Sequence, residues 1–111
     1  MSIPLEDHFE DIVGKAMRGL HLSVADLAAR TGVDRDTLAR LCRGEFHDES
    51  ALRKIAPILA RHPGALVIAA SRAWRPRDVA LEGLAPFNTP YRDMRVNSFL
   101  LWDPATREAA L

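Results

Sequence analysis

Arginines and short polar side chains gather between residues 23 and 43, where they are best placed to bind an anion or a base edge. The guanidinium fork pairs with phosphates and with the edge of guanine. Arg35, Thr37 and Arg40 fall at polar positions of an expected helix, so they are candidates for contacts to base edges or to a nucleic-acid backbone. Ser23, at the N-terminus of the helix before it, and Arg43 are candidate phosphate contacts.

The same charges also permit a simpler interpretation, in which they form only a solvated surface. Acidic side chains interleave with the arginines and offset them: the bases are Arg30, Arg35, Arg40 and Arg43, and the acids are Asp26, Asp34 and Asp36. The net charge of the whole chain is zero. Residues 1–75 hold eleven Lys or Arg against ten Asp or Glu, and residues 76–111 hold four against five. A monomer is therefore expected to bind non-specific DNA weakly at physiological salt.

Other kinds of chemistry find little support. The four histidines, at 8, 21, 47 and 62, lack metal-ligand spacing, and the single cysteine, Cys42, excludes an internal disulfide and a cysteine-based zinc cluster. Cys42 is expected on the inner face of a helix, as a small apolar residue. No nucleophile triad or glycine-rich phosphate loop is present. We therefore expect no catalytic residue, metal or cofactor in this chain.

Five segments must position these residues, and their patterns predict helices. Pro4 to about Leu20 carries a helical apolar stripe. The second helix starts at a Ser23 cap, with Asp26 as capping-box partner, and ends at Thr31-Gly32. The third is capped by Asp34 and ends at Gly44. The fourth helix runs from a cap at Asp48 or Ser50 to about His62 and contains Pro57. The fifth segment, from Pro63 to about Trp74, is either a helix or a buried strand, and we favour the helix. The inward residues expected are Leu5, Phe9, Ile12, Val13, Ala16 and Leu20, then Val24, Leu27 and Ala28, then Leu38, Leu41 and Cys42, then Leu52, Ile55, Ala56 and Leu59.

The composition changes after residue 75, which divides the chain into a helical domain, 1–75, a linker, 76–86, and a β extension, 87–111. Prolines at 76, 86, 90 and 104 prevent long helices. Val96 to Trp102 reads as a strand, Asp103-Pro104-Ala105-Thr106 as a turn, and Arg107 to Leu111 as the second strand of a hairpin. The fold class expected is mainly α with a C-terminal β-hairpin.

The segment from Leu27 to Leu41 has the pattern of two short helices that meet across a tight turn. Ala28 permits close approach, Gly32 supplies the turn, and Val33 fills the gap between the helices, while Leu38 and Leu41 hold the second helix to the core. Such a turn lets the second helix project into a major groove.

On these residues, Ser23 to Ala28 and Thr37 to Glu45 resemble the core of helix-turn-helix domains of the lambda-repressor/Cro (XRE) type, and the likeness spans about residues 5–75. It implies a five-helix fold that binds double-stranded DNA as a transcription regulator. We expect a homodimer, because two recognition helices one turn of DNA apart add their contacts. This chain departs from the family at Val24, where a DNA-contacting glutamine is frequent, and at the acidic Asp34 and Asp36. These departures favour an alternative, a domain for interaction or dimerisation that has lost its DNA affinity.

Residues 87–111 resemble, over a short stretch, the opening strands of metallo-β-lactamase-fold hydrolases. That family's His-x-His-x-Asp-His zinc motif does not occur before Leu111. A lone hairpin is marginal in water, so it needs a cover. It could pack on the helical domain, pair with a second copy, or begin a larger domain. The third option fits the resemblance best, and it makes the alternative function an interaction domain at the N-terminus of such a hydrolase.

The sequence gives no sign of a membrane or export segment. Its N-terminus is acidic, unlike a signal peptide, and the longest apolar run, 65–70, is too short to cross a bilayer. The lone cysteine fits a reducing cytoplasm.

Overall fold

The computed structural model describes residues 5–111 and comprises five α-helices followed by a three-stranded antiparallel sheet. The mainly-α class with a C-terminal hairpin is therefore confirmed. The described chain divides into two units, a helical unit of residues 7–74 and a sheet unit of residues 75–111 that also includes Leu5 and Glu6. Pro4, predicted to lie in the first helical turn, falls outside the described residues.

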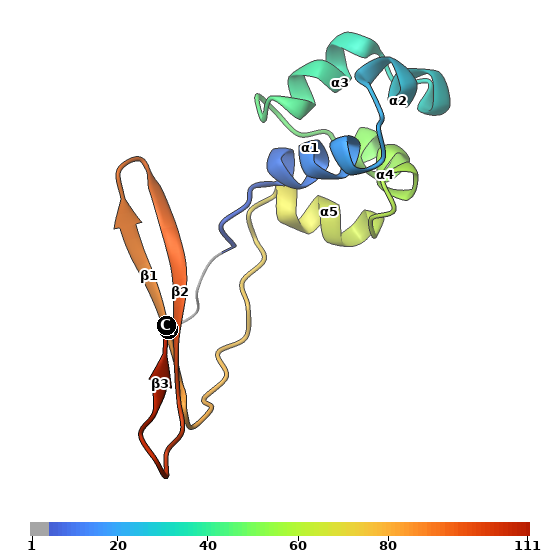
Figure 1. Ribbon diagram of the computed structural model, residues 1–111. Helices are drawn as coiled ribbons and strands as arrows, with labels where there is room; N and C mark the ends of the chain where they lie inside the picture. The colour runs from blue at the N-terminus through green and yellow to red at the C-terminus, as the bar shows by residue number, and fades with distance from the viewer. Residues whose placement is uncertain (1–4) are drawn as a thin grey trace. The chain divides into compact units, whose positions relative to one another are not determined.

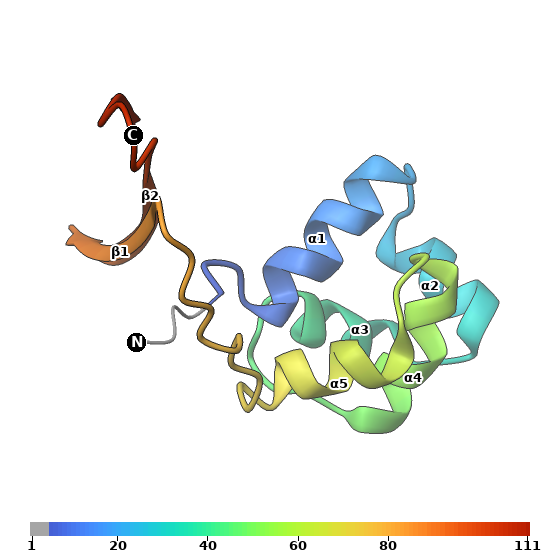
Figure 2. The ribbon, with the colours of Figure 1, turned by 90° about the horizontal axis from the view of Figure 1, so that it is seen from below.

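The helical unit contains α1 (Phe9–Gly19), α2 (Val24–Thr31), α3 (Arg35–Cys42), α4 (Glu49–Ile58) and α5 (Pro63–Ala70) (Figures 1 and 2). Helix α2 packs against α3 and α4, while α1 packs against α3 and α5. A single apolar cluster joins the five helices, and its largest fully buried side chains are Val13, Leu27, Leu38, Leu41, Leu52, Ile55 and Leu59. The predicted inward positions of α2, α3 and α4 are thus confirmed.

Local chemistry fixes where these helices begin. Asp34 caps α3 by accepting the N–H of Thr37 at 3.0 Å. Asp48, one of the two predicted caps, starts α4 by accepting the N–H of Ala51 at 2.7 Å. Pro63 is the first residue of α5, where its missing N–H costs nothing. The choice of helix over strand for this segment is confirmed.

Three predictions about the first and fifth helices are wrong in detail. Helix α1 starts at Phe9, after a His8 cap, and leaves Leu5 outside, 50% exposed. Leu20 is 45% exposed, because it follows the last helical residue instead of lying on the buried stripe. Helix α5 ends at Ala70, since Arg72 adopts a positive φ of 56° that stops it short of Trp74.

The sheet unit holds β1 (Leu84–Tyr91), β2 (Met94–Trp102) and β3 (Ala109–Ala110), in that order. The predicted turn between β2 and β3 is confirmed: Asp103 Oδ1 accepts the N–H groups of Ala105 and Thr106 at 2.7 and 3.2 Å. The predicted second strand is shorter than expected, with only two residues in the ladder.

Strand β1 starts inside the expected linker, three residues before the predicted β extension, and no separate strand was assigned to residues 84–91. Register pairs Leu84 with Leu101 and Tyr91 with Met94. The Trp102 N–H donates to Gly83 O at 2.9 Å, so alternation places the backbone of Pro86 and Pro90 on the outer side of the strand. Proline is tolerated there, because an outward N–H has no ladder partner to lose.

Candidate nucleic-acid interface

The turn between α2 and α3 consists of Gly32, Val33 and Asp34. Gly32 adopts the left-handed conformation, with φ 72° and ψ 6°, and its N–H donates to Ala28 O at 2.9 Å. The side chains of Val33 and Ala28 pack, partly buried, against the core. A turn of three residues with a glycine is common between two short helices that meet at a steep angle.

The side chain of Thr31 stabilises this turn through two hydrogen bonds. Its hydroxyl donates to Leu27 O at 2.6 Å and accepts the N–H of Val33 at 3.2 Å. One side chain therefore satisfies a carbonyl of the last turn of α2 and an N–H of the connection. This role of Thr31 was missed by sequence reasoning, although threonine is known to form such local bonds.

The outer side of α3 carries three of the five candidate contact residues. Arg35 is exposed and makes no hydrogen bond or ion pair within residues 5–111. Thr37 is half-buried and points its hydroxyl at the capping carboxylate of Asp34, at 3.4 Å. Arg40 is exposed, and its guanidinium lies 4.8 Å from the centre of the Phe46 ring. The structure thus leaves Arg35 available and holds Arg40 in place.

Arg40 and Arg43 converge on a single acid, Glu45, that sequence reasoning did not single out. Arg40 Nε donates to Glu45 Oε2 at 3.2 Å, and Arg43 Nε donates to Oε1 at 2.6 Å. The hydrogen bond from Arg43 lowers the pKa of Glu45, and the hydrogen bond to Glu45 raises the pKa of Arg43. The i and i+5 spacing of Arg40 and Glu45 crosses the end of α3, so helical periodicity could not reveal the pair.

Ser23 lies at the N-terminus of α2, as predicted, but its hydroxyl is already occupied. Ser23 Oγ accepts the N–H of Asp26 at 3.1 Å and donates to Asp26 Oδ2 at 2.7 Å, while the Ser23 N–H donates to the same oxygen at 2.7 Å. Those bonds lower the pKa of Asp26. The carboxylate of Asp26 stands where an anion would approach, which disfavours a phosphate contact through the Ser23 hydroxyl.

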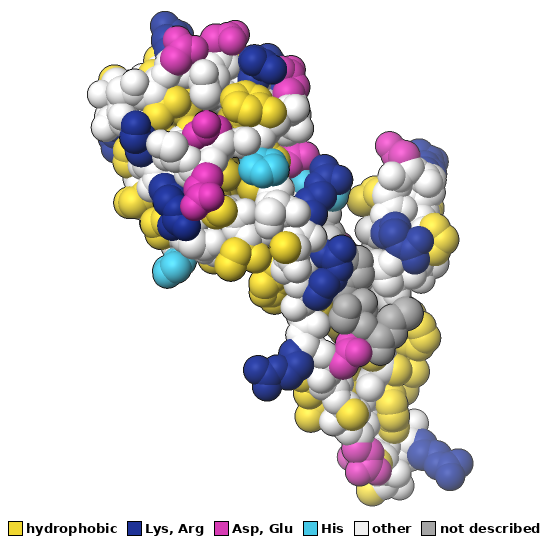
Figure 3. Space-filling model, turned by 180° about the vertical axis from the view of Figure 1, so that it is seen from behind, with side chains coloured by type: hydrophobic (Ala, Val, Ile, Leu, Met, Phe, Trp, Pro, Cys, Tyr) yellow, Lys and Arg dark blue, Asp and Glu magenta, His cyan; other side chains and the backbone are white. Residues whose placement is uncertain are grey.

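The positive and negative charges of residues 23–45 are equal in number. The segment contains four arginines and four acids: Arg30, Arg35, Arg40 and Arg43 against Asp26, Asp34, Asp36 and Glu45. The space-filling view agrees, since acidic and basic side chains intermingle over the visible face of the helical unit instead of separating into one basic patch (Figure 3). Any affinity for a polyanion must therefore come from local placement of the arginines.

Other parts of the described chain offer less. No three His, Cys, Asp or Glu side chains gather as a metal site would require among residues 5–111, and no helix there is long and apolar enough to cross a membrane. Cys42 is half-buried against the core, its Sγ 3.7 Å from Met17 Sδ, and burial raises its pKa. A thiol in that state is a poor nucleophile.

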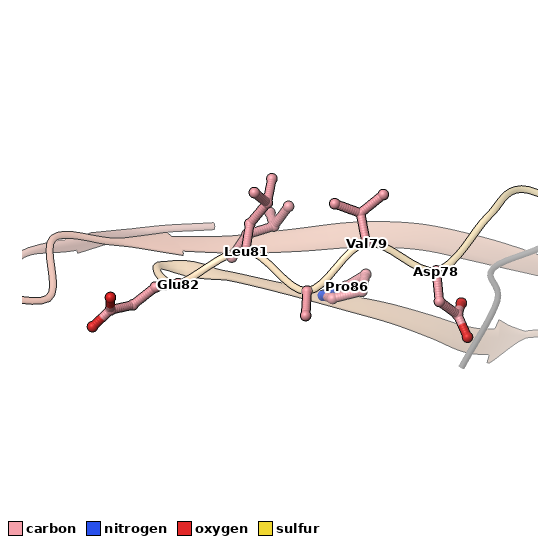
Figure 4. Close-up of a pocket in the computed structure, with 7 residues that line it drawn as sticks. Asp78, Val79, Leu81, Glu82 and Pro86 are labelled. Carbon is pink, nitrogen blue, oxygen red and sulfur yellow. The ribbon is translucent and has the colours of Figure 1, made fainter.

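A depression in the sheet unit lies between the extended segment 78–82 and the start of β1. Val79 and Leu81 point to one side of this segment, while Asp78 and Glu82 point to the other (Figure 4). The acids thus diverge from the apolar side chains instead of converging with them on one point. The depression is open to solvent and lacks the enclosed, convergent geometry of a ligand site.

Comparisons of the chain with models of protein families, with curated proteins and with solved structures found no match.

Proposed function

We propose that the helical unit is a helix-turn-helix domain of the lambda-repressor/Cro type that binds double-stranded DNA with α3 in the major groove, and that it regulates transcription. The observation that carries this proposal is the α2–turn–α3 unit: two eight-residue helices joined through left-handed Gly32 and fixed by buried Leu27 and Leu38. The exposed Arg35 and the positioned Arg40 then occupy the side of the unit that faces away from the core.

The roles within this interface follow from the side chains. Arg35 offers the guanidinium fork that pairs with O6 and N7 of guanine, and Arg40, held beside Glu45, offers its guanidinium to a base edge or to the backbone. Thr37 offers a hydroxyl to a base or to the backbone, and Arg43, just past α3, reaches a phosphate. A homodimer would present two α3 helices to half-sites one turn of DNA apart, which would offset the low net charge.

The experiment is a fluorescence-anisotropy titration of a random-sequence duplex, at low and at physiological salt. Wild type should bind at low salt and weaken as salt rises, because phosphate contacts release counterions. The Arg35→Ala/Arg40→Ala variant should bind at least tenfold less tightly. Sedimentation of the complex would count the copies bound per duplex. Absence of wild-type binding at low salt would contradict the proposal.

A second function is favoured by the acids that offset every arginine of the motif. In this alternative, the helical unit is an interaction or dimerisation domain without DNA affinity, at the N-terminus of a metallo-β-lactamase-fold hydrolase. The sheet supports it, since Phe87 and Phe99 are 45% and 49% exposed, and apolar sheets of this kind are usually covered. The same titration separates the two functions, because only the first requires binding to the duplex.

A further inference from the structure

The pairing of Arg40 and Arg43 with Glu45 has the form of an occupied anion site. Two guanidinium groups approach the two oxygens of one carboxylate, through Nε at 3.2 and 2.6 Å. All three side chains are about half exposed, so an ion from solution can reach them. Within the described residues, the terminal nitrogens of both arginines make no hydrogen bond. The Glu45 carboxylate therefore occupies the centre of the site, while the terminal N–H groups of Arg40 and Arg43 are still available to a second anion.

The position of Glu45 is set by the local backbone. Gly44, the residue after the Arg43 cap of α3, adopts a positive φ of 70°, and the N–H of Glu45 donates to Arg40 O at 3.1 Å. This turn brings the Glu45 side chain back beside the last turn of α3. The ring of Phe46, whose centre lies 4.8 Å from the Arg40 guanidinium, also positions the Arg40 side chain through a cation–π contact. The geometry is thus built by three consecutive residues, 44 to 46.

We propose that Arg40 and Arg43 form one binding site for a backbone phosphate of DNA, that Glu45 fills this site in the free protein, and that a phosphate displaces Glu45 when DNA binds. The inference rests on the proposed DNA-binding function and specifies how that interface is controlled. A carboxylate and a phosphodiester both accept charge-assisted hydrogen bonds from arginine, so one can replace the other.

The exchange has two measurable consequences. Glu45→Gln removes one negative charge beside the phosphate, and a unit charge about 6 Å away in a water-like medium changes affinity roughly threefold. The salt dependence should also change. In the wild type, a phosphate replaces a carboxylate, whereas in the variant it replaces solution anions and leaves no carboxylate beside the DNA. The slope of log K against log salt should therefore steepen, by up to about 0.9.

The test compares wild type with Glu45→Gln in anisotropy titrations of a random-sequence duplex over a salt series. Glu49→Gln is the matched control: it makes the same charge change and breaks a similar exposed pair, Glu49 with Arg53 Nε at 2.9 Å, in α4. A Glu45→Gln/Arg40→Ala/Arg43→Ala variant removes the site itself. Circular dichroism melts of all proteins check that each is folded before binding is compared.

We expect Glu45→Gln to bind about threefold or more tightly than wild type at low salt, with a steeper salt slope. Glu49→Gln should change affinity less and leave the slope unchanged, and the triple variant should lose the gain. If Glu45→Gln and Glu49→Gln behave alike while wild type binds, the exchange is wrong and the proposed function stands. Weaker binding by Glu45→Gln would show that Glu45 instead positions the arginines. If neither wild type nor Glu45→Gln binds at low salt, both proposals fail together.

Discussion

Replacement of Gly32 and Gly44 by alanine probes the two left-handed positions that shape the motif. Gly32 has φ 72° and Gly44 has φ 70°, so an alanine at either site meets nearly the same backbone strain. Their surroundings differ. Among residues 5–111, a Cβ at Gly32 would meet nothing within 4 Å, whereas a Cβ at Gly44 would lie 2.6 Å from Cδ and Oε1 of Glu10. The two variants therefore separate conformational strain from steric conflict.

The expected magnitudes follow from that difference. The left-handed conformation costs a residue with a Cβ about 1–2 kcal/mol, and alanine recovers roughly 0.4–1 kcal/mol by restricting the unfolded chain. Gly32→Ala should therefore destabilise the helical unit by about 1 kcal/mol, or a Tm drop of about 4–8 °C for a domain of this size. Gly44→Ala should cost slightly more than Gly32→Ala, because the same strain is joined by displacement of the Glu10 carboxyl, the end of a flexible side chain whose Oε2 is buried with no hydrogen-bond partner among residues 5–111.

Thermal melts followed by circular dichroism at 222 nm measure both effects. The double variant Glu10→Ala/Gly44→Ala should recover the excess loss, leaving only the strain seen in Gly32→Ala. Equal Tm values for Gly32→Ala and Gly44→Ala would refute the steric reasoning at Gly44. A Gly32→Ala protein as stable as wild type would refute the left-handed turn, and with it the α2–α3 geometry on which the proposed function depends.

Two further predictions concern the core and the α2 cap. Leu38→Ala, at a fully buried position of α3, should lower the free energy of unfolding by about 2–5 kcal/mol through lost burial and the cavity left behind. Urea denaturation would measure this loss, and a loss below about 1 kcal/mol would contradict the packing of α3. The pKa of Asp26 is lowered by its bond from the Ser23 N–H, so its contribution to stability is full above the unfolded value and is lost as pH falls through the lower folded value. The Tm difference between wild type and Asp26→Asn should thus be constant above about pH 5 and shrink below roughly pH 4, and a difference that grows on acidification would overturn this assignment.

The helical unit could be predicted because its local and tertiary preferences agree. Ser23, Asp34 and Asp48 are strong caps, and each starts a helix whose apolar face reaches the same core. The errors lie at the ends, where the backbone leaves the helix for reasons that periodicity does not encode. Arg72 at φ 56° is one such position, since arginine carries no sequence preference for the left-handed region.

The extent of strand β1 and the role of Glu45 could not be predicted from the sequence, for a different reason. Pro86 and Pro90 indicate a loop when read locally, and only the register with β2 shows that their missing N–H groups face away from the ladder. Glu45 acts across the end of α3, through a turn whose direction depends on the φ of Gly44. Both features depend on which residues the fold brings together, strand with strand and acid with arginine. The sequence shows only residue type and spacing.

The central claim, that α3 is the surface that binds DNA, is tested most directly by mapping backbone amide shifts in a ¹⁵N–¹H correlation spectrum during titration with a random-sequence duplex at low salt. We predict that the perturbed amides cluster in the turn at Gly32–Asp34, along α3 and at 43–46, and that they return to their free positions as salt is added. Shifts confined to the sheet unit, or none at all at low salt, would contradict the account.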